Sequence, residues 1–155
     1  MDSTILAYIA GFLDGDGSIF FQIVRRKDYK LGFQIRSSLA FYQKTKFVSI
    51  LRWLKRNFKS GYIRNRKTGI SDYTIVDPKE VEKIILLLQP YVKLKKKQVA
   101  LGLKILHKLK STKSKKEFLE ICKLVDKFGK LNYSKKRTIT YKVVRDYFEN
   151  KSIPL

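Results

Sequence analysis

Two aspartates near the N-terminus are the residues of this chain best suited to chemistry. Asp14 and Asp16 stand on either side of a glycine in the segment IAGFLDGDG, residues 9–17, which reads as the end of a helix. Acidic residues are scarce, with 13 Asp and Glu against 35 Lys and Arg. Asp-Gly is also common in plain turns. However, two carboxylates in succession at the negative end of a helix dipole are unfavourable, so we favour metal binding.

The same helix carries a stripe of small residues. Ala7, Gly11 and Gly15 recur every four positions and therefore lie on one face. Small residues let a second backbone approach closely, and the chain holds no second copy of the pattern, so we expect pairing with the same helix of another copy. Packing against an internal helix is the alternative. The expected dimer interface also includes Ala10 and Asp14. Of the two aspartates, we expect Asp16 to carry the chemistry and Asp14 to support the helix end.

Pairing of two such helices would bring two Asp16 carboxylates together. Like charges at that spacing are unfavourable unless cations lie between them. Hard oxygen ligands suit Mg²⁺, which keeps several waters and takes its other ligands from carboxylates and phosphates. Mn²⁺ or Ca²⁺ could occupy the same site. Shared cations beside a phosphodiester would activate water and stabilise the leaving oxygen.

Composition points to an anionic partner. The chain of 155 residues is about the size of one domain and carries a formal net charge of +22. Such a charge repels itself in a compact fold, so we expect nucleic acid as the partner, with an anionic membrane surface a distant second. The longest aliphatic run, residues 84–88, is too short to span a bilayer. The chain has no signal-like opening and a single cysteine, Cys122, which predict an intracellular protein.

Hydrophobic periodicity predicts helices and two hairpins in alternation. A helix over 4–14, capped by Ser3 or Thr4 and stopped by Gly15 and Gly17, precedes alternating strands. Asp77-Pro78 is a strong start for a later helix. We expect strands at 18–26, 33–41, 61–65 and 71–76, and helices at 47–58, 78–88, 93–109, 115–131 and 141–150. This order predicts an α+β fold with a four-stranded antiparallel sheet covered by helices on one face.

The N-terminal segment resembles the LAGLIDADG motif, and the predicted order αββαββα with additional C-terminal helices matches the core of the LAGLIDADG homing endonucleases. Further landmarks agree: FYQKT at 41–45, GYIRNR at 61–66, SDY at 71–73 and LQPYVKLK at 88–95. The chain resembles the single-motif, homodimeric branch of that family over nearly all its length, less closely after Asn132.

The resemblance implies particular site residues. Asp16 would bind the metal, with the Gly15 carbonyl beside it, and Gln43 and Lys95 would handle the water network and the scissile phosphate. An amide can orient water, and an ammonium can offset developing charge on a phosphate. The family also has a basic residue about four positions after the glutamine, where this chain has Phe47. Either Lys46 takes that role through a local shift, or the role is absent.

The outward-facing side chains of the predicted sheet would read DNA, because a twisted sheet fits the major groove and Gln and Arg can pair with adenine and guanine. A plain solvent-facing polar surface is the alternative. The lysines at 93–97 and 108–116 and the cluster of Lys135, Lys136 and Arg137 would contact phosphates. The expected DNA-binding residues are Gln22, Val24, Arg26, Tyr29, Lys30, Gln34, Arg36, Ser38, Arg64, Arg66, Asp72 and Thr74.

These observations predict a homodimeric, Mg²⁺-dependent endonuclease that cuts both strands of a long pseudo-palindromic DNA target. The resemblance further implies 3′ overhangs and a role in intron mobility, inside an organelle (chloroplast or mitochondrion) or a prokaryotic or archaeal cytoplasm. Two alternatives stay open: an intron maturase that binds intron RNA, and a non-catalytic DNA-binding regulator on the same fold. The carboxylate pair argues against the regulator, because a pure binder has no use for it.

Overall fold

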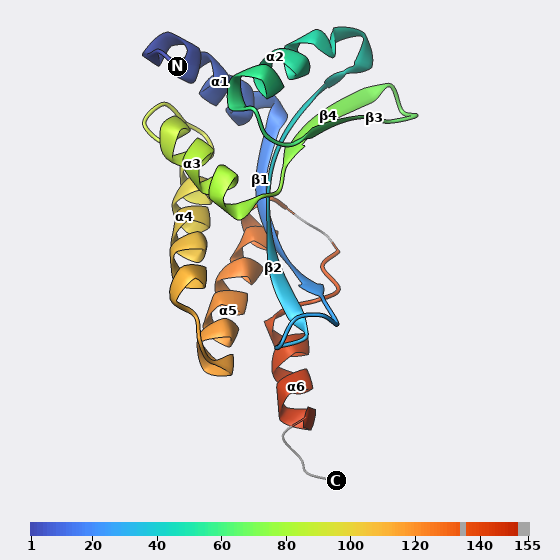
Figure 1. The fold of residues 1–155 in the computed structure, drawn as a ribbon, viewed down its shortest axis with the longest axis vertical. Coiled ribbons are helices and arrows are strands. Elements are labelled where there is room, and N and C mark those ends of the chain that lie inside the picture. Colours follow the sequence, from blue (N-terminus) through green and yellow to red (C-terminus); the bar gives the residue numbers. More distant parts are fainter. Residues whose placement is uncertain (134–135, 152–155) are drawn as a thin grey trace.

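Six helices and four strands build the structure, a computed structural model that describes residues 1–133 and 136–151 (Figure 1). The predicted α+β class is confirmed, with the helix–hairpin–helix–hairpin order followed by helices. The elements in chain order are α1 (Ser3–Asp16), β1 (Gly17–Arg25), β2 (Phe33–Lys44), a short 3₁₀ turn (Thr45–Phe47), α2 (Ser49–Phe58), β3 (Tyr62–Asn65), β4 (Ile70–Ile75), α3 (Pro78–Leu88), α4 (Lys96–Ser111), α5 (Lys115–Leu131) and α6 (Tyr141–Lys151).

The strands form one antiparallel sheet in the order β1-β2-β4-β3. Alternate residues of β1 are buried, so one face of the sheet belongs to the core and the other is left open. The helices gather on the core face: α1 and α3 contact β2, α4 and α5 contact β1, and α2 contacts β4. Figure 1 shows α3, α4 and α5 standing along one side of the long β1–β2 hairpin.

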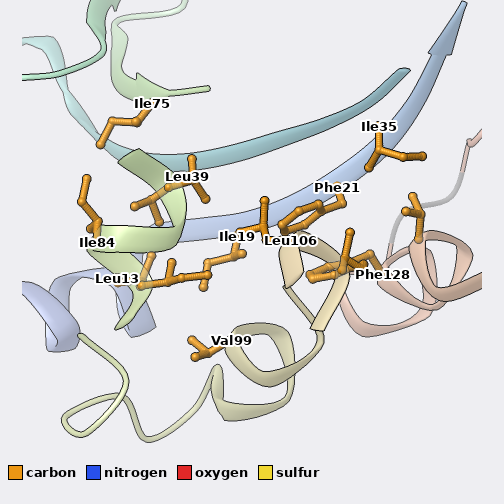
Figure 2. Close-up of a cluster of buried hydrophobic side chains, with 14 of the residues drawn as sticks. Leu13, Ile19, Phe21, Ile35, Leu39, Ile75, Ile84, Val99, Leu106 and Phe128 are labelled. Atoms are coloured by element: carbon orange, nitrogen blue, oxygen red, sulfur yellow. The ribbon is translucent and has the colours of Figure 1, made fainter. Parts of the chain in front are cut away.

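The core lies between the sheet and these helices. Leu13 of α1, Ile19 and Phe21 of β1, Leu39 of β2 and Phe128 of α5 are fully buried there (Figure 2). The rings of Phe21 and Phe128 lie with centroids 5.0 Å apart, which joins β1 to α5. The core therefore holds the end of α1 and the start of β1 in one place, and the segment IAGFLDGDG spans this junction.

The first helix differs from the prediction at both ends. Asp2, rather than Ser3 or Thr4, is the N-cap, since its side chain accepts the N–H groups of Thr4 and Ile5. Gly15 does not stop the helix, which continues to Asp16. Gly17 ends it, and an added Cβ there would lie 2.8 Å from the Leu13 Cα, so the position has no room for a side chain.

Other helix and strand boundaries differ from the predicted ones for physical reasons. β2 extends to Lys44 because residues 42–44 pair with residues 70–72 of β4. α4 begins at Lys96 rather than residue 93, since the N–H groups of 93–95 are bound elsewhere, as described below. α4 also continues to Ser111 and α5 begins at Lys115, so most of the basic stretch 108–116 is helical. The prediction of a helix over 115–131 is confirmed. In the described part of the chain, no helix is long and apolar enough to cross a membrane.

Candidate active site

Asp16 is the last residue of α1 and its side chain is exposed. Its carboxylate makes no hydrogen bond or ion pair with any residue that the structure describes. Together with Gln43 it lines a cavity of about 630 Å³, bounded on one side by α1 and on the other by the residues that follow β2. The two predicted site residues from α1 and β2 are therefore brought together, with a carboxylate free to take a ligand.

The carboxylate of Asp14, two residues earlier, accepts three backbone hydrogen bonds. Its Oδ2 accepts the backbone N–H groups of Lys93 at 2.7 Å and Leu94 at 3.1 Å, and its Oδ1 accepts that of Lys95 at 3.0 Å. Burial alone would raise the pKa of Asp14, but these three hydrogen bonds and the charge of Lys95 lower it overall. The Asp14 carboxylate faces the loop before α4, because that loop offers three donors, and its place in a dimer interface stays a prediction.

The Lys95 side chain also contacts the end of α1. Its Nζ donates to the backbone oxygen of Asp14 at 2.7 Å. Burial lowers the pKa of Lys95 below its usual value, and the charges of Asp14 and Asp16 offset part of that effect. The residue lines a groove of about 940 Å³ together with four other lysines: Lys93, Lys96, Lys97 and Lys130. An ammonium with spare donors thus lies at the end of α1, and its residue lines a basic groove.

Four residues after Gln43 the chain has Phe47, with Lys46 beside it. Phe47 lines the cavity of Asp16 and Gln43 and is 53% exposed, which is unusual for a phenylalanine. The Nζ of Lys46 lies 4.9 Å from the centre of the Phe47 ring. A cation over an aromatic face is attracted to it. The predicted residue Lys46 is therefore next to the cavity but does not line it.

The outer face of α1 carries the small residues. Ala7, Gly11 and Gly15 are exposed, and a Cβ built on either glycine would have nothing within 4 Å. Packing against an internal helix, the alternative considered above, is therefore wrong for this stripe. Ala10 must be corrected as well: it is fully buried in the core because it lies about a quarter turn from Gly11, on the side that faces the sheet.

The open face of the sheet gathers most of the predicted DNA-contacting residues. Cross-strand partners share a face, and the register pairs Gln22 with Arg36 and Val24 with Gln34. Arg64 likewise lies opposite Asp72. Tyr29 and Lys30 are exposed at the tip of the β1–β2 hairpin.

Arg26 has a partner that the sequence pattern did not reveal. Its Nε and Nη2 donate to the Asp28 carboxylate at 3.0 and 2.8 Å, and its Nη1 donates to Gln34 at 3.1 Å. The guanidinium also lies 5.1 Å from the centre of the Tyr29 ring. Only the spacing of an acid two residues after the arginine could have signalled this arrangement.

Three predicted DNA contacts are buried on this face: Ser38, Asp72 and Thr74 are 4%, 0% and 9% exposed. Short side chains in the middle of a sheet are covered by longer neighbours. Asp72 Oδ1 accepts Arg64 Nε at 3.2 Å and Arg66 Nε at 2.7 Å, and its Oδ2 accepts Thr74 Oγ1 at 2.9 Å. The prediction that these three residues contact bases directly is therefore corrected, and Asp72 instead holds two arginines.

The basic cluster after α5 is described only in part. Lys135 lies outside the described residues, and Lys136 is exposed. Arg137 donates to the Val125 carbonyl at 3.1 Å, so it holds the connector between α5 and α6 against α5. Among the described residues, no three His, Cys, Asp or Glu side chains gather as a metal cluster.

Comparison with known proteins agrees with this arrangement of fold and site. The family model described as LAGLIDADG endonuclease matches residues 9–104. The chain is 39% identical to the DNA endonuclease I-CvuI of Chlorella vulgaris over 145 residues, which are 94% of this chain and 90% of that protein. It is 40% identical to the DNA endonuclease I-CreI of Chlamydomonas reinhardtii over 148 residues, 95% and 90% of the two chains. The chain therefore belongs to the LAGLIDADG endonuclease family, and the predicted resemblance and enzyme class are confirmed.

Solved structures extend the likeness to three dimensions. The crystal structure of I-CvuI in complex with the I-CreI target in the presence of 2 mM Mg matches with a TM-score of 0.91 and 36% identity, over 98% of this chain and 97% of that one. A second I-CvuI structure, with its own target and 2 mM Ca, matches with a TM-score of 0.90, 36% identity and the same coverage. The archaeal I-Vdi141I in complex with DNA shares the fold, with a TM-score of 0.83 at 20% identity, over 97% of this chain and 98% of that one.

Proposed function

We propose that this chain is a homing endonuclease that cuts both strands of a long, pseudo-palindromic DNA target as a homodimer. The observation that carries the proposal is the free carboxylate of Asp16 at the end of α1, beside Gln43 and next to an exposed stripe of small residues. One chain supplies one such carboxylate, so two copies are needed for two cuts. Its relatives I-CvuI and I-CreI are named DNA endonucleases, which supports the substrate class.

The dimer would form through the outer face of α1. Ala7, Gly11 and Gly15 present no bulk, so two copies of the helix can approach closely across a twofold axis. Tyr8, on the same helix, is 56% exposed and would also be covered. The twofold symmetry of the protein is the reason to expect a pseudo-palindromic target.

The residues at the end of α1 fit a magnesium ion. Mg²⁺ prefers oxygen ligands and is commonly bound by one or two carboxylates together with waters and substrate phosphates, which one Asp16 from each copy would satisfy. Gly15 would add its carbonyl oxygen. When bound, the ion would activate water and stabilise the leaving oxygen of the phosphodiester. The relative I-CvuI was crystallised with Mg and with Ca, which supports divalent metal use, and Mn²⁺ is a further candidate.

The surrounding side chains have separate tasks in this proposal. Gln43 orients water beside Asp16, and the Lys95 ammonium offsets charge that develops on the phosphate. The Lys46 ammonium on the Phe47 ring adds a second positive charge near the cavity. The open face of the sheet would lie in the major groove, with Gln22, Gln34 and Arg36 towards the base edges.

Cutting would leave 3′ overhangs and serve intron mobility, inside an organelle or a prokaryotic or archaeal cytoplasm. These finer properties rest on the family resemblance. If the protein is instead an intron maturase, it should bind intron RNA in preference to duplex DNA.

The test uses a duplex selected by the wild-type protein from a randomised library in Ca²⁺. We expect wild type to cut this duplex in Mg²⁺, and Asp16→Asn to bind it within about threefold of wild type while cutting at least about 1,000-fold more slowly. Asp77→Asn, an exposed carboxylate at the start of α3, is the matched control and should cut normally. Normal cutting by Asp16→Asn would contradict the metal assignment, and no cutting by wild type in any divalent metal would contradict the enzyme.

A further inference from the structure

Lys95 is tied to Asp14 at two points. Its backbone N–H donates to Asp14 Oδ1 at 3.0 Å, and its side-chain Nζ donates to the backbone oxygen of Asp14 at 2.7 Å. The lysine side chain thus folds back over the residue whose carboxylate holds its own main chain. Few lysines are restrained in this way, because a four-carbon stem normally leaves the ammonium free to move.

The Asp14 carboxylate also binds the backbone of the two residues that precede Lys95. Lys93 and Leu94 donate their N–H groups to Asp14 Oδ2 at 2.7 and 3.1 Å. These donors precede the N-terminus of α4, whose N-cap residue Lys95 makes no side-chain hydrogen bond that caps the helix. The Asp14 carboxylate therefore supplies the negative charge that a helix N-terminus favours, from a residue 79 positions away from Lys93 in the sequence.

The hydrogen bond from Lys95 Nζ also stabilises the C-terminal end of α1. The backbone oxygen of Asp14 is one of the terminal carbonyls of α1, which lack partners within the helix and form its negative end. The Lys95 ammonium takes up this carbonyl and keeps two further N–H donors. Asp16 follows two residues later, and its negative charge acts on Lys95. The spare donors of Lys95 are therefore held at the end of α1, two residues before the carboxylate proposed to bind the metal.

We propose that Asp14 is a positioning residue of the nuclease site, which acts by holding the Lys95 ammonium at the end of α1 that carries Asp16. The inference rests on the proposed function, in which Lys95 meets the scissile phosphate, and adds that the first aspartate of the segment works through that lysine. A misplacement of about 1 Å at such a group can cost about 100-fold in rate, so the restraint has a measurable consequence.

A double-mutant cycle tests this coupling. Asp14→Asn keeps the size of the side chain but turns one acceptor oxygen into an NH₂ group, which would face an N–H donor of residues 93–95. We expect the single-turnover cutting rate at saturating protein to fall about 30- to 100-fold in Asp14→Asn and about 100- to 1,000-fold in Lys95→Met. The double variant should be no slower than Lys95→Met by more than about threefold, because residues that act as a unit are not additive.

The control is Asp77→Ala, which removes a carboxylate that caps a different helix by accepting the Glu80 N–H at 3.0 Å. It should cost stability but leave the cutting rate within about threefold of wild type, alone or combined with Lys95→Met. The milder Asp14→Ser, which keeps one acceptor, replaces Asp14→Asn if that variant does not fold. Rate losses of Asp14→Asn and Lys95→Met that multiply in the double variant would overturn the proposal, as would unfolding of both Asp14 variants.

A second readout separates this inference from the proposed function. Labelled with ¹⁵N and ¹³C at lysine, the wild-type protein should show a restrained side-chain ammonium signal that is lost in Lys95→Met and moves to the position of free lysines in Asp14→Asn, whereas the signals of Lys110 and Lys123, which bind Glu82 and Glu120, should stay in place. This signal needs no DNA. If wild type cuts no duplex but the signal behaves as expected, the proposed function fails while the clamp on Lys95 stands. An unmoved signal in Asp14→Asn would contradict the clamp whatever the cutting activity.

Discussion

The carboxylate of Asp72 lies 2.7 Å from Nε of Arg66, although the aspartate side chain is fully buried and the arginine is 42% exposed. Arg64 contributes a second bond at 3.2 Å. In a chain of net charge +22, one buried carboxylate thus fixes two guanidinium groups at the open face of the sheet. Burial alone would raise the pKa of Asp72, but the hydrogen bonds from Arg66, Thr74 and Arg64 and the charge of Arg66 lower it overall.

The first prediction concerns the pH dependence of stability. Because the pKa of Asp72 is lower in the folded protein, its contribution is complete above the unfolded value of about 3.9 and is lost as the pH falls through the folded value. We expect Asp72→Asn to cost about 1–2 kcal/mol at pH 7, or a fall in Tm of about 2–8 °C, and the difference from wild type to shrink below about pH 4. Thermal unfolding from pH 2 to 7 measures this. A difference that stays constant over that range would contradict the assignment.

The second prediction concerns the dimer. Gly11→Leu adds a side chain to the exposed face of α1, where no atom of the same chain lies within 4 Å of the new Cβ. We expect the folded protein to become monomeric in sedimentation velocity and to lose double-strand cutting. Helicity should be kept, because leucine favours a helix by roughly 0.8 kcal/mol over glycine.

Ala100→Leu provides the matched change, since Ala100 is also an exposed small residue on a helix, α4, away from the stripe. It should leave the oligomeric state of wild type unchanged. A Gly11→Leu protein that sediments like wild type would show that the α1 stripe is not the interface.

The third prediction concerns base recognition. Arg36 is exposed on β2 opposite Gln22, and no hydrogen bond ties its guanidinium to the described residues. Arg36→Ala should cost about 1–3 kcal/mol of binding to the selected duplex and relax the preference at one base pair in each half of the target. Arg52, exposed on α2 on the other side of the sheet, gives the control with the same loss of charge. Equal losses on all duplexes for both variants would mean that Arg36 contributes charge alone.

The fourth prediction concerns Cys122. Burial, with a smaller effect from the charge of Asp126, raises the pKa of its thiol to about 12 from 9.0. At pH 8 the native protein should react with a thiol reagent about a thousandfold more slowly than the same protein in guanidinium chloride, since the thiolate is the reactive form. Colorimetric titration measures both rates. Rapid reaction of the native protein would contradict the burial of this side chain.

The sequence by itself determined the order of the elements and the faces of the strands. Alternation along β1 and β2 and helical spacing elsewhere are local patterns, so they survive without knowledge of the neighbours. The same holds for Asp16, since its place at a helix end depends on the residues around it. The αββαββα order and the family resemblance followed from these signals and are confirmed.

The tertiary structure decided which partner each side chain has. The sequence spacing predicted that Ala10 lies near the small stripe, but its side chain is buried in the core, because the sheet lies on that side of the helix. Asp72 lies on the outward face of its strand as predicted, but Arg64 and Arg66 form ion pairs with its carboxylate. Such choices depend on contacts between segments that are distant along the chain, which a local pattern does not contain.

The two aspartates of the opening segment show the same division most clearly. From the sequence they are two carboxylates on one helix end, with Asp16 expected to carry the chemistry and Asp14 to support the helix end. In the fold, the loop 93–95 supplies three donors to Asp14 and none to Asp16. Two positions are about 200° of helical rotation, so one carboxylate faces the loop while the other is left exposed to bind a ligand.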